Sequence, residues 1–174
     1  MAYEGQHITN PRTGQQMTFI ELMPGLLRID TINPPGGAPE PMHVHPHQLS
    51  GTDVTAGALV FEVAGQRRVV HAGESIEIPP GAPHRFWNEG SDDATAIGWF
   101  RPALDTAAFF ESMFSLADRS QLKANGMPRL LPLVALAGHF SNEIRPVSPP
   151  WPVLRAITSA LSPVARARGY TGRA

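Results

Sequence analysis

The sequence contains no cysteine, one lysine and no long apolar run. Without thiols the chain can form neither disulfides nor thiolate metal sites, and it has no cysteine nucleophile. The only lysine, Lys123, lies outside the motifs described below, which argues against Schiff-base chemistry. The longest apolar stretch covers eight residues, 130–137, and contains Pro132. A membrane span needs about 20 apolar residues, so we expect no membrane partner.

Charge is also scarce. Charged residues make up 17% of the chain and the formal net charge is -1, so a nucleic-acid partner is not expected. The first ten residues show no basic region followed by an apolar run, so no signal peptide is visible. No glycine-rich phosphate-binding loop precedes a predicted helix. These absences favour a cytoplasmic protein whose partner is a small molecule.

The part of the chain that is rich in turns is typical of an all-β domain. Short runs of β-branched, aromatic and aliphatic residues alternate with Pro-Gly and Ala-Gly breaks. Predicted strands cover residues 17–22, 26–32, 58–65, 67–71, 75–78, 84–87 and 94–100. Seven short strands at this spacing predict a mainly β sandwich, barrel or jelly roll over residues 1–101.

Residues 102–174, which we call the C-terminal extension, show helical rather than strand periodicity. The predicted helices run from Asp105 to about residue 126, over 129–140, and from about Pro152 onward. Pro163 should kink or restart the last helix. We expect the C-terminal extension to pack on the β domain or on a dimer partner.

Three of the seven histidines share a pattern that suits a metal ion. His43 and His45 are two residues apart, and on a strand they would point to the same face, about 7 Å from each other. His84 begins another predicted strand. Two imidazoles from one strand and a third from a facing strand would form a facial set, which leaves positions open for water or substrate.

The residues around these histidines form two spaced motifs. The first is Gly37, five residues, His43-x-His45, four residues, Ser50, six residues, Gly57. The second is Gly73, five residues, Pro79-x-Gly81, two residues, His84, three residues, Asn88. Both resemble the motifs of the cupins in residue type and interval, except that cupins usually have a glutamate at the position of Ser50.

The resemblance implies a cupin-type jelly-roll β-barrel with one divalent metal inside, held by His43, His45 and His84. It also leaves open a metal-free cupin whose histidines line a ligand pocket. The helical C-terminal extension looks like that of a group of bacterial single-domain cupins, to which we attach no function.

The missing glutamate would change the chemistry of the metal site. Under the shorter motif spacing the position falls on Leu49, which cannot bind metal. Gln48 offers only a weak amide oxygen, and Asp53 should face the opposite side of the strand. Three neutral imidazoles would leave the ion its full +2 charge and favour anionic, chelating ligands. Fe²⁺ is the favoured metal, with Zn²⁺, Ni²⁺ or Cu²⁺ as alternatives that also suit imidazole.

Other pocket residues follow from parity and position. Phe86 has the parity of His84 and should face the pocket, where we also place Ser50. His47 could be a substitute ligand, a proton shuttle or a surface residue. Its turn context favours the surface, yet it is the one candidate that we can name for a catalytic base.

Three functions are compatible with these residues. The first is an O₂-dependent oxygenase with a three-histidine iron site, acting on a small chelating molecule. The second is a non-redox metal-dependent isomerase, cyclase or lyase. The third is a non-catalytic small-molecule-binding cupin that has lost metal affinity with its glutamate. Because exposed strand edges need covering, we also expect a homodimer.

Overall fold

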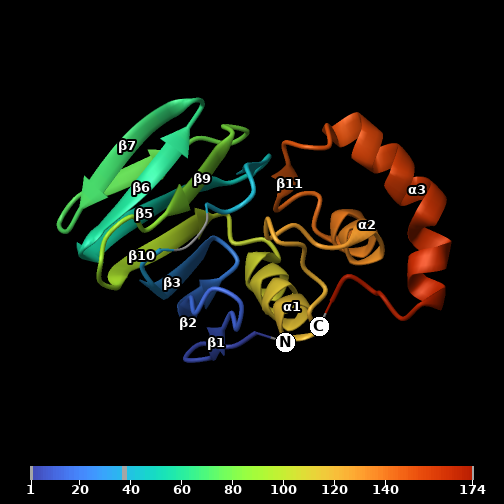
Figure 1. Ribbon diagram of the computed structural model, residues 1–174, viewed down its shortest axis with the longest axis horizontal. Coiled ribbons are helices and arrows are strands. Elements are labelled where there is room, and N and C mark those ends of the chain that lie inside the picture. The colour runs from blue at the N-terminus through green and yellow to red at the C-terminus, as the bar shows by residue number, and fades with distance from the viewer. Residues whose placement is uncertain (1, 37–38, 174) are drawn as a thin grey trace.

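The computed structural model describes residues 2–36 and 39–173, so Gly37 of the first motif lies outside the described residues. Two antiparallel sheets lie face to face and helices follow them, as the sequence predicts (Figure 1). The six-stranded sheet has the order β1-β2-β3-β10-β5-β8. Its strands are β1 (His7–Thr9), β2 (Gln16–Met23), β3 (Leu26–Asn33), β10 (Ala94–Arg101), β5 (Leu49–Ala56) and β8 (Ser75–Ile78).

The five-stranded sheet carries the histidine motifs. Its order is β11-β4-β9-β6-β7. Its strands are β11 (Arg145–Pro146), β4 (His43–Val44), β9 (His84–Trp87), β6 (Ala58–Val63) and β7 (Gln66–His71). Strand β11 belongs to the C-terminal extension and pairs with β4, with Arg145 opposite Val44 and Pro146 opposite His43. The extension therefore contributes backbone to the sheet that holds the histidines.

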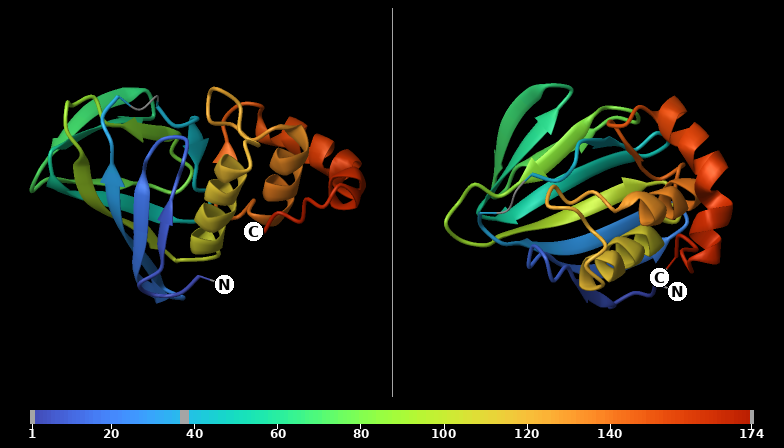
Figure 2. Two further views of the ribbon diagram at one scale, coloured as in Figure 1. Left: turned by 60° about the horizontal axis from the view of Figure 1, so that its bottom comes forward. Right: turned by 45° about the vertical axis from the view of Figure 1, so that its right-hand side comes forward.

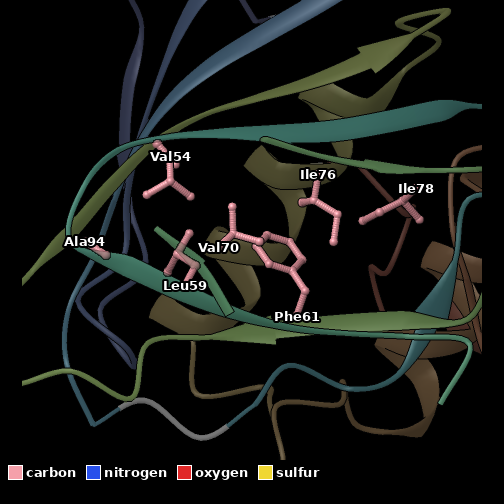
Figure 3. Close-up of a cluster of buried hydrophobic side chains, with 8 residues drawn as sticks. Val54, Leu59, Phe61, Val70, Ile76, Ile78 and Ala94 are labelled. Carbon is pink, nitrogen blue, oxygen red and sulfur yellow. The ribbon is translucent and has the colours of Figure 1, made fainter. Parts of the chain in front are cut away.

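A hydrophobic core lies between the two sheets (Figure 3). Apolar side chains alternate with polar ones along the strands, so one face of each sheet turns inward. The core cluster comprises Val54, Leu59, Phe61, Val70, Ile76, Ile78, Ala94 and Ala96. This core occupies one end of the sandwich and leaves the other end to the helices.

The helices gather at that other end, with α3 outermost (Figures 1 and 2). They are α1 (Thr106–Asp118), α2 (Leu130–His139) and α3 (Trp151–Ala167). Helix α1 packs on the inner face of the six-stranded sheet, where Ala107 and Phe114 join a buried cluster with Phe19 and Ile29. The predicted mainly β sandwich followed by helices is thus confirmed.

One helix end and one internal proline differ from the sequence prediction. Helix α1 ends at Asp118 rather than near residue 126, because the chain turns and forms an isolated bridge between Leu122 and Pro128. Helix α3 continues through Pro163, so the restart, one of the two expected effects of this proline, does not occur. Within the described residues, no helix has the length and apolar character that crossing a membrane requires.

Candidate metal centre

The structure brings His43, His45 and His84 together. His43 on β4 lies directly opposite His84 on β9 in the antiparallel ladder, and His45 follows one residue after β4 ends. One ring nitrogen of each histidine lies within 4.8 Å of the other two. The ring centroids are 4.3 to 5.1 Å apart. His45 and His84 are only 5% and 4% exposed, so the cluster is a buried one.

Backbone carbonyls fix the tautomer of all three imidazoles. Each Nδ1 lies within hydrogen-bond distance of a carbonyl oxygen, and a carbonyl can only accept. The acceptors are Pro41 for His43 (2.9 Å), Glu143 for His45 (2.7 Å) and Ala82 for His84 (2.9 Å). Nδ1 therefore carries the proton and Nε2 is left with a free lone pair, as metal-ligating histidines require.

Burial keeps these imidazoles neutral. It lowers the pKa of His45 to about 4, with the charge of a protonated His84 as a second cause. Burial also lowers the pKa of His84, and that of His43 still further because both other histidines add to the effect. Three neutral, desolvated donors at such distances fit a divalent ion that accepts imidazole.

No carboxylate completes this donor set: the group of potential metal ligands formed by the described residues contains only the three histidines. Ser50, at the position of the usual glutamate, is 3% exposed and its Oγ has no hydrogen-bond partner. Gln48 turns away, and its amide nitrogen donates to Pro102 O at 2.7 Å and to Thr106 Oγ1 at 2.8 Å. A bound divalent ion would keep its full charge.

The histidines open on a cavity of about 270 Å³ between the sheets and the helices. Ser50 and Phe86 both line it, and Phe86 stacks on Phe61 with the ring centroids 5.5 Å apart. Six of the eight phenylalanines of the chain contribute to its wall. The cavity is therefore largely apolar, with a polar end at the histidine cluster.

His47 lies elsewhere. Its side chain is exposed and is not among the residues that line the cavity. Strand β4 ends at Val44 and Pro46 interrupts the extended chain, so the parity that His47 shares with His45 does not turn it inward. The structure thus separates His47 from the residues with which the sequence grouped it.

Glu40 is a cavity residue that the sequence did not indicate. It is the one acidic side chain among the described lining residues, and no hydrogen bond or ion pair joins it to another described residue. Burial raises the pKa of Glu40 to about 7. Its place three residues before His43, in a proline-rich segment, is a signal that could have prompted a search for an acid beside the motif.

Comparison with known proteins agrees with this fold. Residues 31–100 match the family model of the cupin domain. They form a cupin domain, and the resemblance seen in the two histidine motifs is confirmed. The match ends at residue 100, before the C-terminal extension. No curated protein matches the chain.

Two solved structures illustrate the likeness. An RmlC-like cupin from Shewanella frigidimarina NCIMB 400 is 22% identical with a TM-score of 0.51, and the alignment covers 62% of this chain and 94% of that one. KdgF from Halomonas sp. is 23% identical with a TM-score of 0.50, over 54% of this chain and 85% of that one. At such identities the likeness concerns the fold alone.

Proposed function

We propose that this protein is a mononuclear metal-dependent oxygenase, which uses O₂ to oxidise a small, partly apolar molecule with chelating oxygen atoms. One observation carries the proposal. Three neutral imidazoles with free Nε2 atoms converge in a largely apolar cavity, and among the described residues no carboxylate belongs to their group of potential metal ligands. With this donor set a divalent ion would keep its full positive charge and have open coordination positions, and both features favour an anionic ligand.

The residues that would hold the ion are His43, His45 and His84. A divalent metal there would supply Lewis acidity, and Fe²⁺ would add the redox chemistry that O₂ requires. Zn²⁺, Ni²⁺ and Cu²⁺ also suit imidazole donors.

The other cavity residues would bind the substrate and move its proton. The phenylalanine wall excludes water, which strengthens electrostatic interactions within the cavity. The buried, unpartnered Oγ of Ser50 is available to hydrogen-bond a substrate oxygen. The carboxylate of Glu40 accepts the acidic proton of the substrate and, once it is a carboxylic acid, can return that proton to the product.

A second candidate is a non-redox isomerase, cyclase or lyase, and Glu40 favours it. An acid with a pKa of about 7 is suited to both proton abstraction and proton return near neutral pH. Such a reaction needs the Lewis acidity of the metal but no O₂.

Metal replacement distinguishes the two candidates. The purified protein would first be analysed for metal, then loaded anaerobically with Fe²⁺ or Zn²⁺ and assayed with a panel of diketones, phenols and hydroxy acids. Oxygen uptake by the iron form alone supports the oxygenase. Turnover by the zinc form without O₂ supports the second candidate. Fully loaded iron protein that consumes no O₂ with any member of the panel contradicts the oxygenase.

A further inference from the structure

The cavity has two walls of different character. The β domain and its loops supply the three histidines, Ser50, and the charged residues Arg12 and Glu40. The C-terminal extension supplies a wall that, among its described residues, contains no charged side chain and one polar one, Asn125. Members of this second wall include Phe109, Phe110, Met113, Leu122, Leu133 and Ile144.

Aromatic contacts connect the two walls. The ring of His45 meets Phe100 edge-on, with centroids 5.1 Å apart. Phe100 in turn lies 5.9 Å from Phe110 on α1, which lies 5.6 Å from Phe109. An apolar surface therefore runs from a metal ligand to the C-terminal extension without a break. Phenylalanine rings favour flat, apolar or aromatic partners in offset or edge-on arrangements.

We infer that the C-terminal extension determines substrate specificity: it accommodates the apolar, preferably aromatic, body of a substrate whose chelating oxygens lie at the histidine cluster. The position of the chelating end rests on the proposed function. A charged group directed at this wall would meet no charged side chain among the described residues of the wall and would bind poorly. A cavity of about 270 Å³ further restricts the body to something near one ring.

Binding of two hydroxamates to the Zn²⁺-loaded full chain tests this inference without turnover. Acetohydroxamate and benzohydroxamate share one chelating group and differ in a methyl or phenyl body. By calorimetry we expect benzohydroxamate to bind about tenfold more tightly or better, because the phenyl ring buries more apolar surface. Equal affinities would overturn the inference.

Two leucines of α2 provide a matched pair of variants. Leu133 lines the cavity, whereas Leu130 is 51% exposed and does not. Leu133→Ala should lower the affinity for benzohydroxamate several-fold and leave the affinity for acetohydroxamate unchanged. Leu130→Ala should change neither affinity. Phe110→Ala is a second wall variant in case Leu133→Ala fails to fold. If the wall variants weaken the binding of both hydroxamates equally, the substitutions act only on the chelating end, and the inference is contradicted.

A third arm needs no metal, so it separates failure of this inference from failure of the proposed function. In metal-free protein labelled at the methionine methyls, millimolar benzohydroxamate should shift the resonance of Met113, and acetohydroxamate should not. Met23 is 51% exposed and serves as the internal control. If benzohydroxamate shifts the Met113 resonance in neither the metal-free nor the Zn²⁺-loaded protein, the inference is contradicted. A shifted Met113 in a protein that binds no Zn²⁺ contradicts the metal site alone.

Discussion

The backbone carbonyl of Glu143, in the C-terminal extension, accepts a hydrogen bond from Nδ1 of His45 at 2.7 Å. The two residues are 98 positions apart. Two further contacts fix the position of the segment that contains this carbonyl. Strand β11 pairs with β4. The Glu143 side chain accepts a hydrogen bond through Oε1 from the Asp105 backbone N–H at 3.3 Å. The extension therefore sets the orientation of one of the three clustered histidines.

Loss of that side-chain tether should weaken metal binding. Glu143→Ala removes the acceptor for the Asp105 N–H and frees the segment, so we expect Zn²⁺ affinity to fall about tenfold, as for other partners of metal-bound histidines. Glu143→Gln keeps an oxygen at the same place and should restore most of the affinity. Calorimetric titration measures both, and an unchanged affinity in Glu143→Ala would show that the tether does not act on the site.

Ser50→Glu should return a carboxylate to the site. Ser50 is buried and lines the cavity that the histidines also line, so we expect a longer side chain there to reach into this cavity. The added anion should tighten Mn²⁺ and Fe²⁺ binding roughly tenfold or more and reduce the charge of the loaded site from +2 to +1. Binding of an anionic chelator such as acetohydroxamate should fall in the same variant.

Ser50→Gln is the matched control, because it has the same length without the charge. Tighter metal binding in the glutamine variant would mean that cavity filling, rather than charge, is responsible. Equal metal affinities in wild type and Ser50→Glu would contradict the placement of Ser50 beside the metal.

Glu40 should leave a signature in the pH dependence of stability. The pKa of about 7 in the folded protein lies above the ordinary value of 4.5 that applies to the unfolded chain. The stability that Glu40 contributes is therefore complete below pH 4.5 and is lost as the pH rises through 7. The free energy of unfolding of Glu40→Gln minus that of wild type should grow by about 1–3 kcal/mol from pH 5 to pH 9.

Chemical denaturation of the metal-free protein at each pH measures this difference. The histidines are the same in both proteins, so their own titration cancels in the comparison. If the free energies of unfolding of wild type and Glu40→Gln change with pH in the same way, Glu40 has an ordinary pKa. The reason for assigning it the proton transfer would then be lost.

The expected homodimer remains a prediction. Strand β7 forms an edge of the five-stranded sheet and most of its side chains are exposed, including Val69 at 37%. Such edges invite pairing with another chain unless something covers them. Light scattering at micromolar concentration should give the mass of two chains, and the mass of one chain would contradict the prediction.

Much of the fold could be predicted because apolar residues alternate with turn residues. Strand β5 escaped prediction because its sequence, LSGTDVTA, has little alternation and carries Gly51 and Asp53. Only the neighbouring strands identify β5 as a strand, since it pairs with β10 on one side and with β8 on the other. Strand β11 is two residues long and depends entirely on tertiary contact with β4.

The site could be predicted in part for a related reason. The spacing of His43, His45 and His84 reflects strand geometry, and the structure places the three together. The direction of a loop residue follows no period, so Glu40 was missed, and for His47 the turn context, which favoured the surface, was a better guide than its parity with His45. The contact between Glu143 and His45 joins distant parts of the chain, so no local sequence pattern could predict it.

Metal stoichiometry in two histidine variants tests the central claim most directly. We expect wild type to bind one Zn²⁺ or Fe²⁺ per chain in a calorimetric titration. His84→Ala should lose this binding, because it removes one of three converging donors. His47→Ala should retain it, because that side chain is exposed and outside the cavity. Wild type that binds no divalent metal, or a His84→Ala variant that binds as tightly as wild type, would contradict the account.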